Sequence, residues 1–555
     1  MIAPKRGSTG TVREVTFDLL RRLHVDAIFG NPGSTELPMF RDFPADFRYV
    51  LGLQESVAVG MADGYAQARG NIAVASLHSA AGVGHALGAI FTAFRNQTPL
   101  LITAGQQARS ILPFDPFLAA VSATEFPKPY VKYAIEPARA EDVPLAIARA
   151  CRIAMQEPRG PVFVSVPVDD WDRETEFLPE RSVVSARYPD PEAIEAIVKA
   201  LETASNPALV VGASVDRGGG WNAMRTLAEK VNGKVYAAAY ANRCGFSENH
   251  PLYAGALPPS RQGIVRLLTG HDYVLVLGSA AFPYHIEEDG PHIPEGATLF
   301  QITENPDFAA WTPSGSALVA DLKPSIEAIA ARLQRSHRSP PARRASPPLV
   351  EPGEAISVEY LMQTLALVRD PHSVLVEEIP TSGQIRRDYI RVDRPASYLC
   401  GASGGLGFGM AGAVGYSLGA PERPVLAIIG DGSAMYTIQS LYSAARENAD
   451  VTYVIVNNQS YLALEEFGKY FAMTEVVGTK LPGLSLAGLA SAMGVAAERV
   501  DRPDRLEAAL REAIGRKGPA LVEVLVTSGT RGPDGTSCAG SGAQEAWQSA
   551  PRREG

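Results

Sequence analysis

The chain has 555 residues, of which 46% are hydrophobic and 20% are charged, and its formal net charge at pH 7 is −9. This length predicts about three domains, and this composition is typical of a globular protein that can bury several cores. The acidic balance, without a basic stripe carrying interleaved aromatic residues, argues against nucleic acid or an anionic membrane as a partner.

The cysteines and the start of the chain indicate where the protein works. The four cysteines, Cys151, Cys244, Cys400 and Cys538, are far apart and form no C-x-x-C pair. This spacing argues against a disulfide framework and a thiolate zinc site, and it is typical of a reducing compartment. No apolar run follows the basic start, and no stretch reaches the ~20 apolar residues of a membrane span. We therefore expect a cytoplasmic protein without a signal peptide.

Apolar runs divide the chain into three blocks, at residues 10–180, 190–335 and 355–527. Short runs rich in valine, isoleucine and leucine alternate there with longer helical patterns, for example at 72–77, 99–105, 207–213, 273–278, 425–430 and 451–456. Unbroken runs of this length are typical of strands buried on both faces of a parallel sheet. We predict an α/β fold of three doubly wound, parallel-sheet domains. Residues 336–354, rich in Pro, Ser and Arg, are a predicted linker, and residues 528–555 a flexible Gly/Ser-rich tail.

Three motifs of the first block follow predicted strands. FGNPGSTELP, at 29–38, places Ser34 at a strand-to-helix turn, and LHSAAG, at 77–82, places His78 at the end of a strand. Between them, Glu55 follows an apolar run and begins a predicted helix. Taken alone, such a glutamate often serves only the helix dipole. The second block offers His285, in the loop FPYHIEED at 282–289, and the sequence leaves a structural role for this histidine equally open.

The third block carries the most informative stretch, which starts with GDG at 430–432 and reaches NN at 457–458 after twenty-four intervening residues. A helix of about a dozen residues is predicted in between. In a right-handed βαβ unit both strands point the same way, so Asp431 and Asn458 should meet at one carboxyl edge. A carboxylate and an amide oxygen suit magnesium, and glycines at a helix start suit a phosphate. A lone GDG could be only a helix cap, but the paired motif favours a metal site.

This spacing resembles the cofactor signature of the thiamine-diphosphate-dependent enzymes. The resemblance implies that Asp431, Asn458 and the backbone carbonyl of Ser460 hold Mg²⁺, which in turn holds thiamine diphosphate. Leu406, in the glycine-rich stretch CGASGGLGFG at 400–409, would lie under the two rings of the cofactor, and Gly404 would meet its amine. The other cofactor-binding positions implied are Asn31, Gly430, Gly432, Ser433, Tyr436 and Tyr461.

The same resemblance gives Glu55 the central role in activation. In the family this acid hydrogen-bonds the pyrimidine ring of a cofactor that is held by a neighbouring subunit, and so promotes proton removal from the thiazolium ring. Glu55 and Asp431 would then approach one cofactor from different domains. We therefore expect a homodimer at minimum, and a homotetramer is usual for the family.

Within the family, the three motifs around Ser34, His78 and His285 resemble those of benzoylformate decarboxylases, and the similarity extends from about residue 10 to 527. It implies that Ser34 seats the carboxylate of a small 2-oxo acid, and that the two histidines move protons. The implied reaction converts benzoylformate to benzaldehyde and CO₂, with carboligation as a side activity. The uncharged residues implied around the substrate side chain are Phe117, Leu118, Leu399, Ala463, Leu464 and Phe467.

Several positions depart from that pattern. His85 stands where a small polar residue or Asn is usual, Leu462 replaces a glycine and Leu399 an aromatic residue. A cluster expected to be rich in Ser and Thr, with hydroxyls on the cofactor, reads Glu378, Ile379, Pro380, Thr381 and Ser382. These departures leave the substrate size and the cofactor affinity open.

Alternative functions remain at this point. A carboligase of the acetolactate synthase type, or a flavin-bearing pyruvate oxidase, would use the same cofactor. A dinucleotide-binding protein is disfavoured because no G-x-G-x-x-G opens a helix after the first strand. A non-catalytic relative is disfavoured because Glu55, Asp431 and Asn458 are all present.

Overall fold

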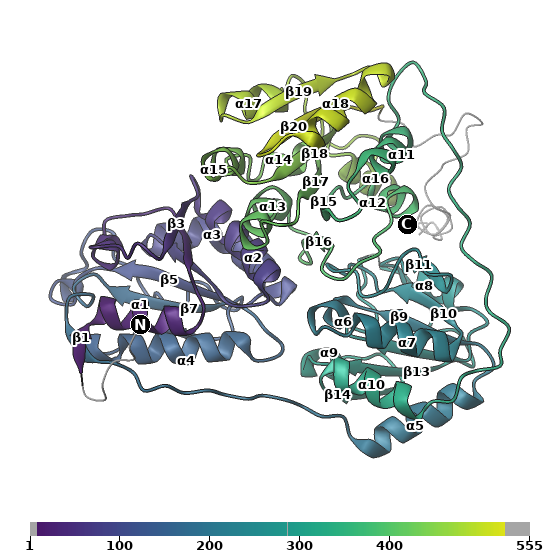
Figure 1. The fold of residues 1–555 in the computed structure, drawn as a ribbon, viewed down its shortest axis with the longest axis horizontal. Helices are drawn as coiled ribbons and strands as arrows, with labels where there is room; N and C mark the ends of the chain where they lie inside the picture. The colour runs from purple at the N-terminus through teal and green to yellow at the C-terminus, as the bar shows by residue number, and fades with distance from the viewer. Residues whose placement is uncertain (1–7, 286, 528–555) are drawn as a thin grey trace.

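The computed structural model of this chain describes residues 8–285 and 287–527. It has three lobes, each built on a six-stranded sheet in which all neighbouring strands are parallel (Figure 1). Central strands are buried along their whole length, as unbroken apolar runs predict. The prediction of three doubly wound α/β domains is confirmed. Within the described ranges, no helix is long and apolar enough to cross a membrane.

The first domain has the strand order β3-β2-β4-β5-β7-β6. Its strands are β2 (Ala27–Gly30), β3 (Arg48–Leu51), β4 (Ala73–Leu77), β5 (Leu100–Gln106), β6 (Ala134–Ile135) and β7 (Val162–Pro167). Its α-helices are α1 (Val12–Arg22), α2 (Glu55–Arg69), α3 (Ser79–Asn96) and α4 (Val143–Met155). A small antiparallel pair, β1 (Thr9–Thr11) and β8 (Glu174–Glu176), lies beside the sheet. After β2 the chain adds β3 on one side of that strand and β4 on the other, so the order of strand addition reverses between β2 and β4. Ligands of doubly wound sheets bind at such a switch point.

The middle domain has the strand order β11-β10-β9-β12-β13-β14. Its strands are β9 (Pro207–Val211), β10 (Lys234–Ala237), β11 (Tyr253–Ala256), β12 (Tyr273–Leu277), β13 (Thr298–Thr303) and β14 (Ser316–Val319). Its helices are α5 (Pro191–Thr203), α6 (Ala213–Arg217), α7 (Trp221–Val231), α8 (Arg261–Leu268), α9 (Pro306–Ala310) and α10 (Leu322–Arg332). In Figure 1 long extended segments lead into α5 and away from α10 along the outside of the molecule.

The third domain has the strand order β16-β15-β17-β18-β20-β19. Its strands are β15 (Val374–Glu378), β16 (Tyr398–Cys400), β17 (Val425–Gly430), β18 (Val451–Asn457), β19 (Ala496–Val500) and β20 (Ala520–Leu525). Its helices are α11 (Val358–Val368), α12 (Gly383–Tyr389), α13 (Phe408–Gly419), α14 (Asp431–Ala434), α15 (Ser440–Glu447), α16 (Leu462–Tyr470), α17 (Leu486–Ala492) and α18 (Pro503–Gly515).

The prediction of one helix between GDG and β18 is wrong, because two short helices, α14 and α15, occupy that segment. Between them the backbone winds through tighter turns, in which Thr437 and Ser440 each bond to the carbonyl three residues earlier. The hydroxyl of Thr437 also donates to the carbonyl of Gly407, 2.8 Å away. This contact with another segment competes with a regular helix.

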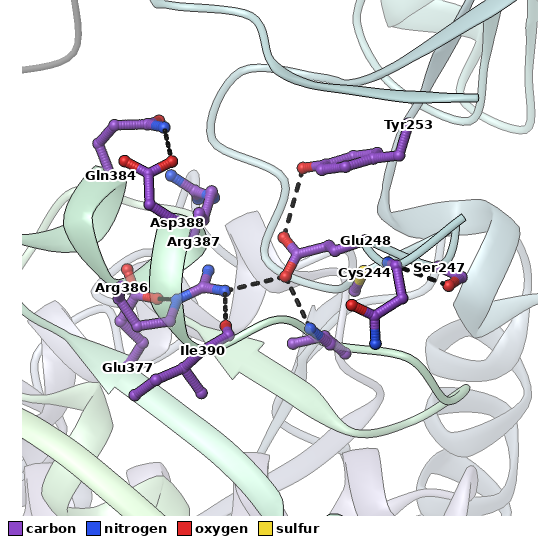
Figure 2. Close-up of polar contacts among 12 residues, drawn as sticks. Cys244, Ser247, Glu248, Tyr253, Glu377, Gln384, Arg386, Arg387, Asp388 and Ile390 are labelled. Atoms are coloured by element: carbon purple, nitrogen blue, oxygen red, sulfur yellow. Dashed lines mark hydrogen bonds and ion pairs between the residues drawn. The ribbon is translucent and has the colours of Figure 1, made fainter. Parts of the chain in front are cut away.

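Two contacts fix the domains against one another. Helices α2 and α13 pack so closely that a Cβ added to Gly64 would lie 2.1 Å from the carbonyl oxygen of Gly412, so the first and third domains meet backbone to backbone. In Figure 2 the guanidinium of Arg386, on α12, lies between Glu377 of β15 and Glu248 of the middle domain. The two distances are 2.5 and 3.2 Å, and Arg386 is only 1% exposed. Breaking such a buried triad would leave a charge without a partner. The triad therefore holds the middle domain against the third domain.

Candidate active site

The first cluster of predicted site residues lies at the switch point of the first sheet. The segment after β2 carries Asn31 and Ser34, and His78 directly follows β4. A Cβ added to Gly33 would lie 2.0 Å from Nδ1 of His78, so the turn rests on the imidazole and only glycine fits. The structure therefore brings the Ser34 turn and His78 together, although 44 positions separate the two residues.

A buried glutamate that the sequence did not single out orients His78. Oε2 of Glu36 lies 2.9 Å from Nδ1 of His78 and accepts from the backbone N–H of Gly33 at 3.0 Å. Its Oε1 accepts from the N–H of Gly105 at 2.9 Å and from the hydroxyl of Thr35 at 2.7 Å. A carboxylate only accepts hydrogen bonds, so Nδ1 is assigned as the protonated nitrogen, which leaves Nε2 with a lone pair for chemistry. In the sequence, Glu36 is one acid near a predicted helix start, and nothing marks it.

Glu55 begins α2 as predicted and is 7% exposed. Its Oε1 lies 3.5 Å from Nδ2 of Asn31, and its Oε2 lies 3.1 Å from Nδ1 of His85 on α3. Asn31 and Glu55, both predicted site residues, are thus neighbours. His85, which the sequence marked only as a departure, is the polar side chain nearest to the Glu55 carboxylate among these contacts.

The second cluster lies at the carboxyl edge of the third sheet. Strands β17 and β18 are parallel neighbours, with Gly430 opposite Val456, so Asp431 and Asn458 emerge at one edge as predicted. Asp431 is 3% exposed, and its Oδ1 accepts from the N–H of Gly432 at 2.9 Å. Within residues 8–285 and 287–527, its Oδ2 has no hydrogen-bond partner. Burial raises the pKa of Asp431, although the N–H groups of Gly432, Gln459 and Ser460 oppose the shift.

An unpartnered, buried carboxylate oxygen fits a hard cation. The first residue of the NN pair, Asn457, donates to the buried Glu523 at 2.7 Å and is structural. Asn458 is the one that faces the edge, where its Oδ1 accepts from the N–H of Ser460 at 3.0 Å. The described residues hold no group of three or more His, Cys, Asp or Glu side chains placed for a metal. Magnesium takes few protein oxygens and completes its shell with phosphate and water, so Asp431 with Asn458 suits it.

The predicted cofactor loop leads into α13. Gly404 has a φ of +75°, a conformation that favours glycine, and Leu406 is half-buried. At the end of the loop, the carboxylate of Glu378 accepts from the N–H groups of Gly407 and Gly409, at 2.7 and 2.6 Å. Burial raises the pKa of Glu378 to about 7, and these backbone donors oppose the shift. The sequence grouped Glu378 with positions that should carry cofactor-facing hydroxyls, but its side chain instead caps the first turn of α13.

The remaining cofactor positions surround α14. Ser433 is buried and Tyr436 is 55% exposed. Tyr461 immediately precedes α16, and its ring lies against α14, because a Cβ added to Gly432 would be 2.4 Å from Cε1 of Tyr461. Gly430, Gly432 and Tyr461 therefore share one surface with Asp431.

The predicted substrate residues fall into three places. His285 of the middle domain lies against Phe467 of α16, with 4.8 Å between ring centroids, and Nδ1 of His285 is 2.7 Å from the hydroxyl of Tyr240. Ala463 and Leu464 lie on the same helix as Phe467. Tyr240 gave no signal in the sequence. The sequence-predicted pair of His285 and Phe467 is brought together.

Two other predicted pocket residues, Phe117 and Leu118, belong to the first domain, and a third, Leu399, is buried in a core. Phe117 is 88% exposed, and the carbonyl of Leu118 accepts from the hydroxyl of Ser79, next to His78, at 2.8 Å. Leu399, in contrast, is 0% exposed and packs in the core with Val376 of the neighbouring strand β15. The structure therefore does not support Leu399 as a pocket residue, because its side chain points into the core formed by α13 and the sheet.

Family models match three parts of the chain. The N-terminal TPP binding domain of thiamine pyrophosphate enzymes matches residues 10–124, the central domain matches 194–329, and the C-terminal TPP binding domain matches 381–524. The chain belongs to the thiamine pyrophosphate enzyme family. Thiamine pyrophosphate is thiamine diphosphate, so the family indicated by the GDG and NN motifs is confirmed.

Several similar members of this family align with nearly the whole length of the chain. A benzoylformate decarboxylase of Pseudomonas aeruginosa is 40% identical over 519 residues, which cover 93% of this chain and 98% of that protein. The solved benzoylformate decarboxylase of Polynucleobacter necessarius has a TM-score of 0.91 at 36% identity, over 94% of this chain and 99% of that one. The thiamine diphosphate-dependent 4-hydroxybenzoylformate decarboxylase of Rhodococcus jostii RHA1 has a TM-score of 0.91 at 38% identity, over 93% and 99%.

Proposed function

We propose that this thiamine pyrophosphate enzyme decarboxylates an aromatic 2-oxo acid, such as benzoylformate, to the aldehyde and CO₂. The observation that carries the proposal is His78, held through Nδ1 by the buried Glu36 beside the Ser34 turn. This arrangement presents an oriented imidazole beside the turn that carries Ser34, which suits proton transfer beside a substrate carboxylate. Similarity to decarboxylases of benzoylformate and 4-hydroxybenzoylformate supports the aromatic substrate.

Mg²⁺ would be held by Asp431, Asn458 and the carbonyl of Ser460. The unpartnered Oδ2 of Asp431 among the described residues supports this assignment, since the buried oxygen lacks any other cation or donor. When bound, the cofactor supplies a carbon nucleophile and an electron sink. The start of α14 would hold its diphosphate, and Leu406 would contact its rings. The remaining positions proposed to contact it are Asn31, Gly404, Gly430, Gly432, Ser433, Tyr436 and Tyr461.

The chain's own residues would divide the remaining chemistry. Glu55 would present a carboxyl group to the pyrimidine ring, from a site only 7% exposed. Ser34 would bind the substrate carboxylate, and His78 and His285 would move protons at the substrate's carbonyl oxygen and at the carbon that CO₂ leaves. The uncharged side chains proposed to enclose the aryl group are Phe117, Leu118, Ala463, Leu464 and Phe467.

We further propose that two copies of the chain complete each site. The first domain, which carries Glu55, and the third domain, which carries Asp431, both have large apolar side chains that are exposed. Phe114, Phe117 and Val121 are 80, 88 and 79% exposed, and Leu464, Phe471 and Val477 are 50, 66 and 85% exposed. Large exposed apolar surfaces mark interfaces, and closed symmetric dimers are the commonest assemblies. The proposed form is a homodimer that assembles further into a homotetramer, and the proposed location is the cytoplasm. The proposed functional domains are residues 10–180, 190–335 and 355–527.

A direct experiment tests the function. Protein stripped with a chelator and dialysed should consume benzoylformate and release benzaldehyde only after both Mg²⁺ and thiamine diphosphate are restored. Benzaldehyde formation is followed by coupled reduction with an alcohol dehydrogenase. Activity without either addition would refute the cofactor assignment, and consumption of pyruvate with formation of acetolactate would favour a carboligase.

A further inference from the structure

The start of α2 is joined to one residue of α3. The carbonyl oxygen of His85 accepts from the hydroxyl of Ser56 at 2.6 Å and from the amide of Gln54 at 3.4 Å. Its imidazole Nδ1 lies 3.1 Å from Oε2 of Glu55. Three consecutive residues of the α2 start, Gln54, Glu55 and Ser56, therefore all contact His85.

His85 also repeats, two helical turns later, the arrangement of His78. The two histidines are seven positions apart on either side of the first turns of α3, so they lie on the same side of the helix. Each has its Nδ1 beside a glutamate of the first domain that is less than 8% exposed, Glu36 for His78 and Glu55 for His85. The side of α3 at the sheet edge thus carries two histidine–glutamate pairs.

The two members of the second pair differ sharply in exposure. The side chain of Glu55 is 10% exposed, whereas that of His85 is 64% exposed. An ion pair with one exposed partner adds little to stability, commonly ~0–1 kcal/mol. The contact is therefore better suited to fixing the orientation of the carboxyl group than to holding the fold. The other side-chain neighbour of that carboxyl, Asn31, lies at 3.5 Å, the outer limit of a hydrogen bond.

We propose that His85 is a positioning residue for Glu55: its Nδ1 holds Oε2, so that Oε1 is presented to the cofactor, and its exposed ring connects the buried carboxyl to solvent for proton exchange. This inference rests on the proposed function, in which Glu55 acts on the pyrimidine ring. A carboxyl group must be held by one oxygen if the other is to meet a ligand in a constant geometry. His85 supplies that contact from a position where a small polar residue or Asn is usual.

The test compares His85→Ala, which removes the ring, with His85→Asn and with Ser56→Ala. Ser56→Ala is the matched control, because it removes a bond to the His85 carbonyl and leaves the ring in place. The first measurement uses the protein without cofactor: the ¹⁵N signals of the His85 ring are compared between wild type and Glu55→Gln at one fixed pH. Because Nδ1 of His85 contacts Oε2 of Glu55, the Nδ1 signal should shift in Glu55→Gln.

The second measurement is exchange of the thiazolium C2 proton for deuterium in the loaded protein, across a pH range. His85→Ala should slow exchange by about tenfold, the effect of losing one hydrogen bond to a charged group. KM for the substrate and Tm should not change, and His85→Asn should recover part of the rate, since its Nδ2 stands where Nδ1 of His85 does and can also donate. Ser56→Ala should exchange at the wild-type rate.

The outcomes separate this inference from the proposed function. Wild-type exchange in Glu55→Gln would overturn the proposed role of Glu55, and the role of His85 with it. Lost exchange in Glu55→Gln together with wild-type exchange in His85→Ala would leave the proposed function intact and overturn the positioning role. An unchanged Nδ1 signal of His85 in Glu55→Gln, or a loss of exchange in Ser56→Ala equal to that in His85→Ala, would also overturn it.

Discussion

Nδ1 of His78 lies 2.9 Å from Oε2 of Glu36, and this pair connects the Ser34 turn to the end of β4. If His78 transfers protons, His78→Ala should lower kcat by about 10²- to 10⁴-fold, the range for a positioned acid or base. Glu36→Gln should lower kcat less and should also lower Tm, because Glu36 accepts from two buried N–H groups. Steady-state kinetics and calorimetric binding of thiamine diphosphate check this, and a loss of cofactor affinity in His78→Ala would contradict it.

Asp431→Ala should remove cofactor retention while leaving the fold intact. The substitution deletes Oδ2, which has no partner in the described part of the chain, together with Oδ1, which accepts from the N–H of Gly432. We expect a Tm slightly below that of the cofactor-free wild type, because this one hydrogen bond is lost, and no rise in Tm when Mg²⁺ and thiamine diphosphate are added. Binding raises stability only when the folded protein binds the ligand. A wild-type increase in Tm would exclude Asp431 as a metal ligand.

His285 should act through its ring and not through the loop that carries it. His285→Ala should lower kcat by about 10²- to 10⁴-fold with unchanged cofactor affinity. Tyr240→Phe removes the hydroxyl that lies 2.7 Å from Nδ1 of His285 and should lower kcat about tenfold. The contact between His285 and Phe467 remains in that variant, which makes it a control for orientation. Wild-type turnover in His285→Ala would return this histidine to a structural role.

Glu378 should make the stability of the cofactor-free protein depend on pH. Burial raises its pKa from 4.5 to about 7, so the folded protein favours the protonated form. Stability contributed in this way is complete below about pH 4.5 and is lost as the pH rises to about 7. Glu378→Gln has no such titration, so the fall in its unfolding free energy between these pH values should be smaller. Denaturant unfolding at several pH values measures both curves, and parallel curves would rule out the titration.

The substrate preference should follow the uncharged pocket. Burying a phenyl group in place of a methyl group is worth roughly 2 kcal/mol, or about thirtyfold in specificity. We therefore expect a higher kcat/KM for benzoylformate than for pyruvate or 2-oxobutyrate in a coupled aldehyde-reduction assay. Phe467→Ala should narrow the difference in kcat/KM between benzoylformate and pyruvate. A higher kcat/KM for pyruvate would contradict the aromatic assignment.

The sequence by itself determined the fold class and the sheet edge at which Asp431 and Asn458 meet. Unbroken apolar runs predicted buried parallel strands, and the βαβ connection rule then placed Asp431 and Asn458 at one edge. These features were readable because they depend on local periodicity and on short spacings along the chain. The same local reasoning placed Glu55 at a helix start, but the helix predicted after GDG was wrong, since Thr437 bonds to Gly407 thirty positions earlier.

Only the tertiary structure decided which side chains contact the predicted site residues. Glu36 meets His78, His285 meets Phe467 and Glu378 meets the start of α13, and each pair is joined across different elements or domains. The sequence marked Glu378 only as a departure from the family pattern and did not single out Glu36, since whether a carboxylate is buried and what it accepts from depend on how the sheets and helices pack. The sequence also could not place His85 and Leu399. The side chain of His85, which departs from the family pattern, contacts Glu55, whereas the predicted pocket residue Leu399 is buried in the core.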